Sequence, residues 1–486
     1  MASEDEETTV AAVPQIVKDL QRTVRSGITR TAEWRMQQLR AILKLVQENE
    51  ERIIQVIAQD IGKPAHEAFL TEIFVATASC KLAIKELKKW MAPQKVPITL
   101  IAFPGTAEVI PEPLGVALII SPWNFPFLLA IDPVIGALAA GCAVVLKPSE
   151  ITPTVSSLLA ELIPQYLDTD AIQVVEGGVP VVTALLEQKW DKIFYTGCPR
   201  VGRIVMAAAA KHLTPVTLEL GGKCPLYIDN SVDLKVSAMR ICQGKWGVNV
   251  GQACISPDYL LVEEDIVSKL VETIKATIVQ FFGEDPSTSA DLGRIVNEFH
   301  FQRLKGLLDD PRTAERIVYG GQCDKKSLSI APTLVLDVPL DTPIMSEEIF
   351  GPILPIITVK GVEKAMDVIL EFPKPLALYI FTTRKAVEEQ LLTGISAGGV
   401  GINETISHFG VPGLPFGGVG ESGMGAYHGK HSFDAFSHKK GVLHKGMGGD
   451  LPAKFPPYTD AKKSLIRCLV TGDFLGVLLV LLRIRK

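Results

Sequence analysis

The sequence predicts an α/β protein built around a doubly wound parallel sheet, followed by a second α/β region. Two continuous apolar runs, 115–122 and 142–148, are typical of strands that are buried on both faces. The segment between them has the small and apolar residues of a packed helix, which completes a βαβ unit. The same alternation continues to about residue 214, and a second alternating region extends to about residue 395.

The segments on either side of these regions have other patterns. Residues 15–90 carry helical periodicity, and the segment 92–113 predicts a hairpin or arm because prolines surround a short apolar run. The glycine-rich region 394–425 is expected to end the folded part.

Composition limits the classes of function. The chain has 486 residues, of which 47% are hydrophobic, so it can form two or three domains. The net charge is −5, and the sequence contains no basic stripe. Both observations argue against nucleic acid as a partner. The cysteines lack CxxC spacing and the N-terminus is acidic, so we expect reduced thiols in the cytosol. His428 and His431 lack further ligands at metal spacing, and no metal site is expected.

The loops that follow the strands are where an open parallel sheet binds ligands. Lys147 and Glu150 follow the second strand, where a dinucleotide fold places the carboxylate that binds the adenosine ribose. Gly197 and Gly202 bracket a turn into a helix whose first amides could face a pyrophosphate, or the turn could use glycine only for its backbone freedom. The GxGxxG match at 418–423 follows a proline-glycine loop and is interpreted as a turn.

Seven motifs together resemble the NAD(P)-dependent aldehyde dehydrogenase superfamily, because they occur in its order: PWNFP (122–126), KPSE (147–150), TGCPRVG (196–202), ELGGK (219–223), GQACISP (251–257), EEIFGP (347–352) and PFGG (415–418). The short N-terminus and the stretch GMGAYHGKHSFDAFSH are similar to the class 3 branch, which includes fatty aldehyde dehydrogenases and plant stress-related members. The resemblance covers about residues 15–445.

The resemblance implies an aldehyde dehydrogenase-like fold and a homodimer. It implies a Rossmann-type NAD(P)-binding domain (11–91 and 107–214), an α/β catalytic domain (215–395) and a β oligomerisation arm (92–106 and 396–445). The linker and apolar tail, 446–486, lie outside the resemblance.

The resemblance also implies the catalytic residues of an aldehyde oxidation. Cys254 aligns with the nucleophile, and Asn124 with the residue that stabilises the oxyanion together with the backbone N–H of Cys254. Glu219 is the usual general base, and Glu348 contacts the nicotinamide ribose or shares the base role. From the residues alone, a single cysteine among eight is more often inert packing, and Asn124 could be a turn residue.

The remaining cofactor-binding candidates lie in the same motifs: Ser121, Pro122, Trp123, Lys147, Glu150, Gly197, Val201, Gly202, Leu220 and Phe350. NAD is the expected cofactor because Glu150 would bind a free 2′-hydroxyl and repel a 2′-phosphate, while Lys147 and Arg200 could offset that repulsion and admit NADP.

The expected substrate is a medium- to long-chain aliphatic aldehyde, such as those released by lipid peroxidation. Trp246, His408 and Phe409 flank the motifs and could line an apolar tunnel, with ordinary packing as the alternative. Two other functions stay open: a relative that passes the thioester to another nucleophile, and a non-catalytic binding protein on this fold. Cys198 and Cys224 stand in the motifs without a role that the resemblance supplies.

The tail contains 18 residues, Leu465 to Leu482, that are interrupted by Arg467 and Asp473. A spanning helix needs about 20 mainly apolar residues, so a shallowly inserted amphipathic helix is expected. That would place a cytoplasmic protein at the cytosolic face of the endoplasmic reticulum membrane. The alternative is a tail that folds back onto the body or across a dimer.

Overall fold

The computed structural model describes residues 4–99 and 102–482 and divides into two compact units. The first unit comprises the chain up to Leu87 together with Pro113–Phe436. The second comprises Lys88–Glu112 together with the chain from Ser437 onward.

The first sheet of the first unit has six strands in the order β17-β7-β6-β3-β4-β5. Its five parallel strands are β3 (Val116–Ile120), β4 (Ala143–Lys147), β5 (Ile172–Val174), β6 (Lys192–Thr196) and β7 (Val216–Glu219). The short β17 (Gly423–Met424) closes one edge and is antiparallel to β7. The order places β3 in the middle of the sheet with β4 and β6 beside it, so the predicted doubly wound α/β fold is confirmed.

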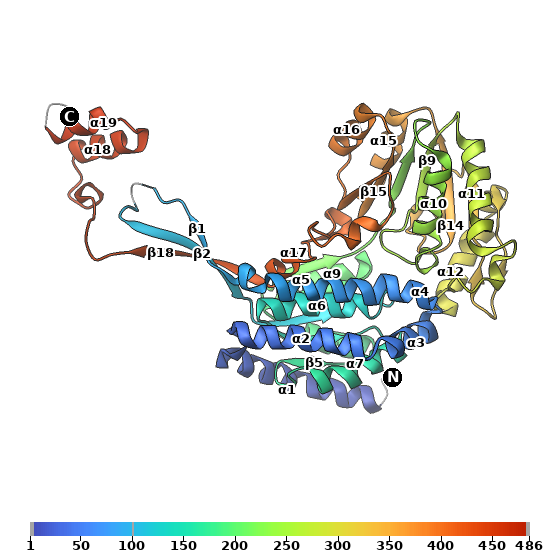
Figure 1. Cartoon of the computed structure of the whole chain (residues 1–486), viewed down its shortest axis with the longest axis horizontal. Coiled ribbons are helices and arrows are strands. Elements are labelled where there is room, and N and C mark those ends of the chain that lie inside the picture. The colour runs from blue at the N-terminus through green and yellow to red at the C-terminus, as the bar shows by residue number, and fades with distance from the viewer. Residues whose placement is uncertain (1–3, 100–101, 483–486) are drawn as a thin grey trace. The chain divides into compact units, whose positions relative to one another are not determined.

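Helices cover this sheet on both faces (Figure 1). The crossover helices are α6 (Leu128–Ala140), α7 (Pro153–Tyr166), α8 (Val179–Leu186) and α9 (Pro199–Ala210). Every residue of α6 is buried, because α2 packs on it from one side and the sheet from another. The N-terminal segment supplies α1 (Glu4–Ser26), α2 (Ala32–Glu48), α3 (Glu50–Ile61), α4 (Ala65–Ala68), the π-helical turn η2 (Phe69–Ile73) and α5 (Phe74–Met91).

The second sheet has seven strands in the order β10-β13-β14-β9-β8-β15-β16. Its strands are β8 (Pro225–Ile228), β9 (Tyr259–Glu263), β10 (Ile317–Tyr319), β13 (Thr333–Leu336), β14 (Ile353–Val359), β15 (Ala377–Phe381) and β16 (Gly399–Ile402). Only β10 is antiparallel to its neighbour among the described strands of this sheet. The main helices around the sheet are α10 (Leu234–Lys245), α11 (Val267–Phe282), α12 (Glu298–Asp309), α15 (Val362–Leu370) and α16 (Lys385–Gly394). Smaller elements are α13 (Pro311–Ala314), α14 (Pro343–Ser346) and the hairpin of β11 (Cys323–Asp324) and β12 (Ser329–Ile330).

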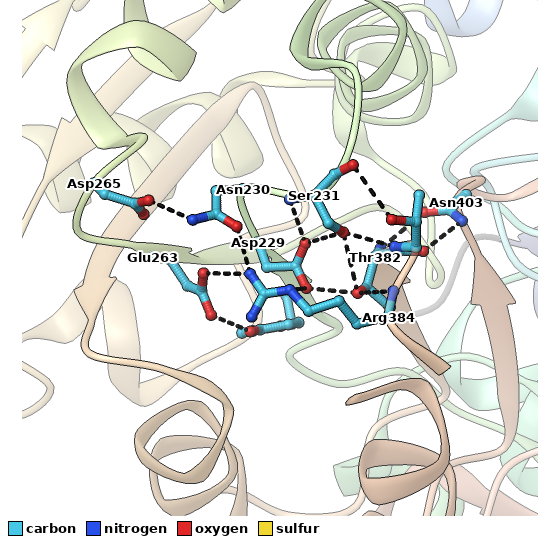
Figure 2. A network of polar contacts seen from close by, with 10 residues as sticks. Asp229, Asn230, Ser231, Glu263, Asp265, Thr382, Arg384 and Asn403 are labelled. Atoms are coloured by element: carbon cyan, nitrogen blue, oxygen red, sulfur yellow. Dashed lines mark hydrogen bonds and ion pairs between the residues drawn. The ribbon is translucent and has the colours of Figure 1, made fainter. Parts of the chain in front are cut away.

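A polar network joins the carboxyl ends of β8, β9, β15 and β16, as Figure 2 shows. Arg384 lies 3.4 Å from the buried carboxylate of Asp229 and 3.0 Å from that of Glu263. The side chain of Asn403 donates to the carbonyl of Thr382 (2.8 Å) and accepts from its N–H (2.9 Å). The network therefore ties the end of β16 to β15 and fixes where the loop after Asn403 begins.

Three observations differ from the predicted boundaries. The strand β7 pairs with β6 in the first sheet, although it lies after the predicted boundary at residue 215. The strand β16 belongs to the second sheet, although the predicted arm begins again at residue 396. The glycine-rich region does not end the folded part, because α17 (Lys430–Ala435) packs on α6 and Phe433 and Phe436 are buried.

The second unit contains a three-stranded sheet in the order β1-β2-β18, from Gln94–Val96, Gly105–Pro113 and Ser437–Lys445. The tail forms two helices, α18 (Asp460–Thr471) and α19 (Phe474–Leu481), which contact each other (Figure 1). They are separated because Gly472 ends α18 in the left-handed conformation (φ 72°) and Asp473 caps α19. Across the described part of the chain, no helix has the length and apolar character needed to cross a membrane.

Candidate active site

Cys254 lies in a tightly packed loop between the 3₁₀ turn η3 (Asn249–Gly251) and β9. A Cβ on Gly251 would lie 2.4 Å from the carbonyl oxygen of Gly351, and its φ is +77°, so only glycine fits there. Asn249 and Val250 also adopt left-handed φ values of 47° and 54°. The surrounding contacts hold this unfavourable backbone, including an N–H···O bond of 2.7 Å from Asn249 to Glu67.

The buried side chain of Gln252 holds the loop from inside. Its amide donates to the carbonyls of Asn249 (3.1 Å) and Arg294 (3.0 Å), and its oxygen accepts from the N–H of Val296 (3.0 Å). The main-chain carbonyl of Gln252 accepts hydrogen bonds from the side chains of Asn124 and Asn249, both at 3.1 Å. The loop that carries Cys254 is thus hydrogen-bonded to the loop that carries Asn124.

Two cavities meet at Cys254. The first, of about 330 Å³, has Pro122, Trp123, Asn124, Gly197, Leu220, Glu348 and Phe350 in its walls. The second, of about 280 Å³, is mainly apolar and has Leu128, Val248, Ile255, Phe409 and Phe416 in its walls, together with Glu219. Cys254 and Thr196 line both cavities. Cys254 therefore lies between the two cavities.

Asn124 is buried in the loop between β3 and α6. Its amide nitrogen carries two hydrogens, and the bond to the carbonyl of Gln252 uses one of them. The other hydrogen can be donated to an oxygen atom held beside Cys254, which is the arrangement that an oxyanion requires.

Glu219 ends β7, and its side chain is buried in the wall of the second cavity. Neither carboxyl oxygen has a hydrogen-bond partner in the described part of the chain. Burial raises the pKa of this carboxyl well above its ordinary value. A carboxyl with a raised pKa and no fixed partner is suited to accept a proton from a water molecule.

Glu348 lies in the walls of the first cavity, where it is set apart from Glu219. Burial, followed by the charge of Asp258, raises the pKa of Glu348 to about 8, while the N–H of Gly222, Lys223 and Arg303 oppose the shift. A Cβ on Gly221 would come within 2.6 Å of the Glu348 carboxylate, so the glycine makes room for it.

The thiol of Cys254 is not activated in this state. Burial raises its pKa, and the charges of Glu348 and Glu219 raise it further, although its own N–H and that of Ile255 act in the opposite direction. A nearby base must therefore take the thiol proton before the sulfur can attack a carbonyl carbon. Cys224 does not contact the cavities; its thiol donates to the carbonyl of Cys254 (3.3 Å) and supports the loop.

The first cavity fits the nicotinamide end of a dinucleotide. Its walls combine apolar faces with the carboxyl of Glu348, and Trp123 and Phe350 pack edge to face at 5.4 Å. Gly197 and Cys198 in its walls precede α9, a twelve-residue helix whose first amides are available to a phosphate. A Cβ on Gly197 would lie 2.1 Å from the hydroxyl of Tyr195, so glycine is needed where the turn packs against this side chain.

Five predicted cofactor residues lie outside the walls of this cavity: Ser121, Lys147, Glu150, Val201 and Gly202. Lys147 is buried and pairs with Glu150 (2.5 Å), whose side chain is about half exposed at the end of β4. Gly202 lets α9 approach Leu220, because a Cβ there would lie 2.9 Å from the leucine side chain.

Two of the three predicted tunnel residues are packing residues. Trp246 is 1% exposed and its indole N–H donates to the carbonyl of Pro352 (2.8 Å), so it belongs to the core. His408 packs beside Phe416 and is not in the walls of the second cavity, and burial lowers its pKa to about 4. Phe409 does line the second cavity, as predicted.

Other wall residues were not found from the sequence. His300 and Arg303 of α12 line the first cavity, and Leu70, Thr71 and Val75 line the second. None of them belongs to a motif, and they come from helices far from the motifs in the sequence. Among the described residues, no group of histidine, cysteine or acidic side chains could hold a metal ion.

Comparison with known proteins agrees with this geometry. Residues 4–442 match the aldehyde dehydrogenase family. The chain is 54% identical to an aldehyde dehydrogenase of Craterostigma plantagineum, covering 95% of this chain and 97% of that one, and 52% identical to aldehyde dehydrogenase family 3 member H1 of Arabidopsis thaliana, covering 97% and 98%. It is 45% identical to the dimeric NADP-preferring aldehyde dehydrogenase of Rattus norvegicus, covering 92% and 98%.

A solved structure of Staphylococcus aureus AldH in a substrate-bound state has the same fold. The TM-score is 0.92 at 40% identity, with 94% of this chain and 99% of that chain covered. With the sheets, the cysteine loop and these relatives in agreement, the chain belongs to the aldehyde dehydrogenase family, in its class 3 branch, and is an NAD(P)-dependent oxidoreductase.

Proposed function

We propose that the protein oxidises medium- to long-chain aliphatic aldehydes, including products of lipid peroxidation, to carboxylic acids, with NAD as the preferred cofactor. The observation that carries the proposal is the position of Cys254 between an apolar cavity and a cavity with the features of a nicotinamide site. An alkyl chain is expected to bind against Leu128, Val248 and Phe409, because burying each methylene contributes about 0.8 kcal/mol.

The reaction begins when a base takes the thiol proton and the sulfur of Cys254 attacks the aldehyde carbon. The C–S bond forms, the carbonyl π electrons move to oxygen, and the amide of Asn124 and the N–H of Cys254 donate to that oxyanion. When bound, the nicotinamide supplies a hydride acceptor. Loss of hydride from the tetrahedral carbon leaves a thioester on Cys254.

Release of the acid requires water in the second cavity. Glu219 takes a proton from this water as the water oxygen attacks the thioester carbon. The C–S bond then breaks with its electron pair on sulfur, and Glu219 returns the proton to the sulfur, which gives the carboxylic acid and the thiol. Support for Glu219 in this role comes from its unpartnered carboxyl on the side of the apolar cavity, whereas Glu348 lies on the cofactor side.

The preference for NAD is proposed from Glu150. Its carboxylate lies beyond β4, the strand end at which dinucleotide folds hold the adenosine ribose. It would accept hydrogen bonds from a 2′-hydroxyl and repel a 2′-phosphate. Lys147 already pairs with Glu150, and this pairing weakens the repulsion.

We further propose a cytoplasmic homodimer whose tail contacts the cytosolic face of the endoplasmic reticulum membrane. The dimer is supported by the rat relative, which is described as dimeric, and a mass of one chain in light scattering would contradict it. Membrane contact is supported by the exposed apolar side chains of α18 and α19, among them Val470, Phe474, Leu475 and Leu478.

The first prediction tests the reaction. We expect the protein to reduce NAD in the presence of aliphatic aldehydes, with efficiency that rises as the chain lengthens from propanal. Cys254→Ala should lower turnover by at least about 10⁴-fold while NAD still binds, because the thiol forms the covalent intermediate. Absorbance of the reduced cofactor measures the efficiency with each aldehyde and the turnover of the variant. Substantial turnover by Cys254→Ala would contradict the mechanism, and efficiency that falls with chain length would contradict the substrate class.

The second prediction separates the two carboxyls by pH. Both have raised pKa values, that of Glu348 about 8, so the basic forms increase as pH rises through those values. Acid release should therefore accelerate from neutral to alkaline pH. Glu219→Gln should slow acid release by roughly 10²-fold or more and should flatten the increase of its rate with pH. Glu348→Gln should keep this increase with pH. Single-turnover hydrolysis of the thioester measures the rate, and a flattened profile in Glu348→Gln alone would reverse the assignment.

The third prediction concerns cofactor choice. The efficiency with NAD should exceed that with NADP by roughly tenfold, since one charge pair near a surface is worth on the order of 1 kcal/mol. Glu150→Gln should narrow this gap, and Glu161→Gln, another exposed acid in the same unit, should not. Equal or better efficiency with NADP in the unmodified protein would contradict the role of Glu150.

The fourth prediction concerns the tail. Full-length protein should float with liposomes that contain anionic lipid, and a truncation after Tyr458, which removes α18 and α19, should stay at the bottom. Failure of both proteins to float would contradict membrane contact. If the truncation then lost stability or changed its substrate range, a tail that folds back onto the body would be the better explanation.

A further inference from the structure

A buried ion pair lies beneath the loop that carries Asn124. Lys63 follows α3, and Glu72 belongs to the π-helical turn η2. The ammonium of Lys63 lies 2.6 Å from Glu72 Oε1, and both side chains are fully buried. Neither residue lines a cavity that reaches Cys254, so the pair has no direct part in the proposed reaction.

Both partners bind the Asn124 loop. Glu72 Oε2 accepts the N–H groups of Phe127 (2.9 Å) and Leu128 (3.1 Å), where α6 begins. Lys63 donates to the carbonyl oxygen of Asn124 (3.4 Å), and its ammonium lies 4.1 Å from the centre of the Phe125 ring. The pair therefore contacts the loop at Asn124 itself and on its C-terminal side.

The opposite side of the same loop is held by the loop of the nucleophile. Asn249 donates to the carbonyl of Asn124 (2.8 Å), and the side chain of Asn124 donates to the carbonyl of Gln252 (3.1 Å). The carbonyl of Asn124 thus receives one hydrogen bond from each side. These contacts fix the backbone from which the amide of Asn124 extends toward Cys254.

The π-helical turn explains how Glu72 reaches this place. Leu70 and Thr71 line the second cavity, while Glu72 and Ile73 are buried. A π turn holds one residue more than an α turn, and such turns are frequent at functional sites. One turn of helix therefore contributes to the wall of the substrate cavity and to the support of the Asn124 loop.

Stability alone does not account for the pair. Taking a lysine and a glutamate out of water is costly, and replacing a buried ion pair by well-packed apolar side chains is often neutral or stabilising. Charge-assisted hydrogen bonds are short and directional, so what they provide is a fixed geometry. The geometry they fix here is that of the loop bearing Asn124.

We propose that Lys63 and Glu72 are positioning residues that hold Asn124 at the distance from Cys254 that oxyanion stabilisation requires. The inference rests on the proposed role of Asn124. It also predicts that the pair acts on the rate of the chemical step and leaves cofactor binding unchanged.

The test uses the full-length protein and two changes of the pair. Lys63→Met with Glu72→Met replaces the pair by apolar side chains that can keep the fold, and Glu72→Gln keeps the shape of the side chain but removes its charge. We expect each to lower kcat by roughly 10- to 100-fold, since a displacement of about 1 Å can have an effect of that size. The affinity for NAD, measured by fluorescence titration, should not change. Arg52→Met with Glu161→Met is the matched control, because it removes an exposed pair that begins on α3, and it should keep the parent kcat.

A double-mutant cycle with Asn124→Ala separates positioning from general damage. If the pair acts through Asn124, adding Lys63→Met and Glu72→Met to Asn124→Ala should lower kcat no further. Losses that multiply in the combined variant would overturn the inference, and so would a parent-like kcat in the folded Met–Met variant. If that variant does not fold, the same cycle with Glu72→Gln decides. Asn124→Ala with unchanged kcat would instead overturn the proposed role of Asn124, which is a different failure.

Discussion

The site depends on the buried side chain of Gln252, which makes hydrogen bonds to two separate stretches of backbone. The side-chain amide donates to the carbonyls of Asn249 and Arg294 and accepts from the N–H of Val296. The main-chain carbonyl of Gln252 accepts a hydrogen bond from the side chain of Asn124. A buried amide with all these partners is rigid, because losing any of them leaves a polar group unpaired away from water. The strained backbone at Asn249 and Val250 is stable only inside this frame. The cysteine and the asparagine are thus placed by one hydrogen-bonded framework.

Burial acts in one direction on the three titratable groups around the site. It raises the pKa of the Cys254 thiol, which favours the protonated thiol, and it raises the pKa of both carboxyls, which makes their deprotonated forms stronger bases. Glu219 and Glu348 lie in the walls of different cavities. In the proposed reaction, this separation assigns the water to Glu219 and the cofactor to Glu348.

Sequence reasoning was strongest where a pattern is local. The apolar runs at 115–122 and 142–148 are the strands β3 and β4, and the motifs place Cys254, Asn124 and Glu219 around one point. It failed for Trp246, because a large apolar residue beside a motif is as suitable for a core as for a tunnel. It also could not find the Lys63–Glu72 pair, since the loop after β3 that the pair contacts lies more than fifty residues away. Leu70 and Thr71 belong to no motif that marks them as cavity residues. The exact boundaries of the two sheets depend on pairing between distant strands, which periodicity does not report.

The π-helical turn at Phe69–Ile73 makes this part of the chain sensitive to its length. Successive residues of an α-helix are rotated by about 100° around its axis. Removing one residue from the turn would therefore rotate the helical segment before it relative to the segment after it. Leu70 and Glu72 could then no longer face the substrate cavity and the Asn124 loop at the same time. The number of residues between Lys63 and α5 therefore cannot change without separating the two surfaces that the turn serves.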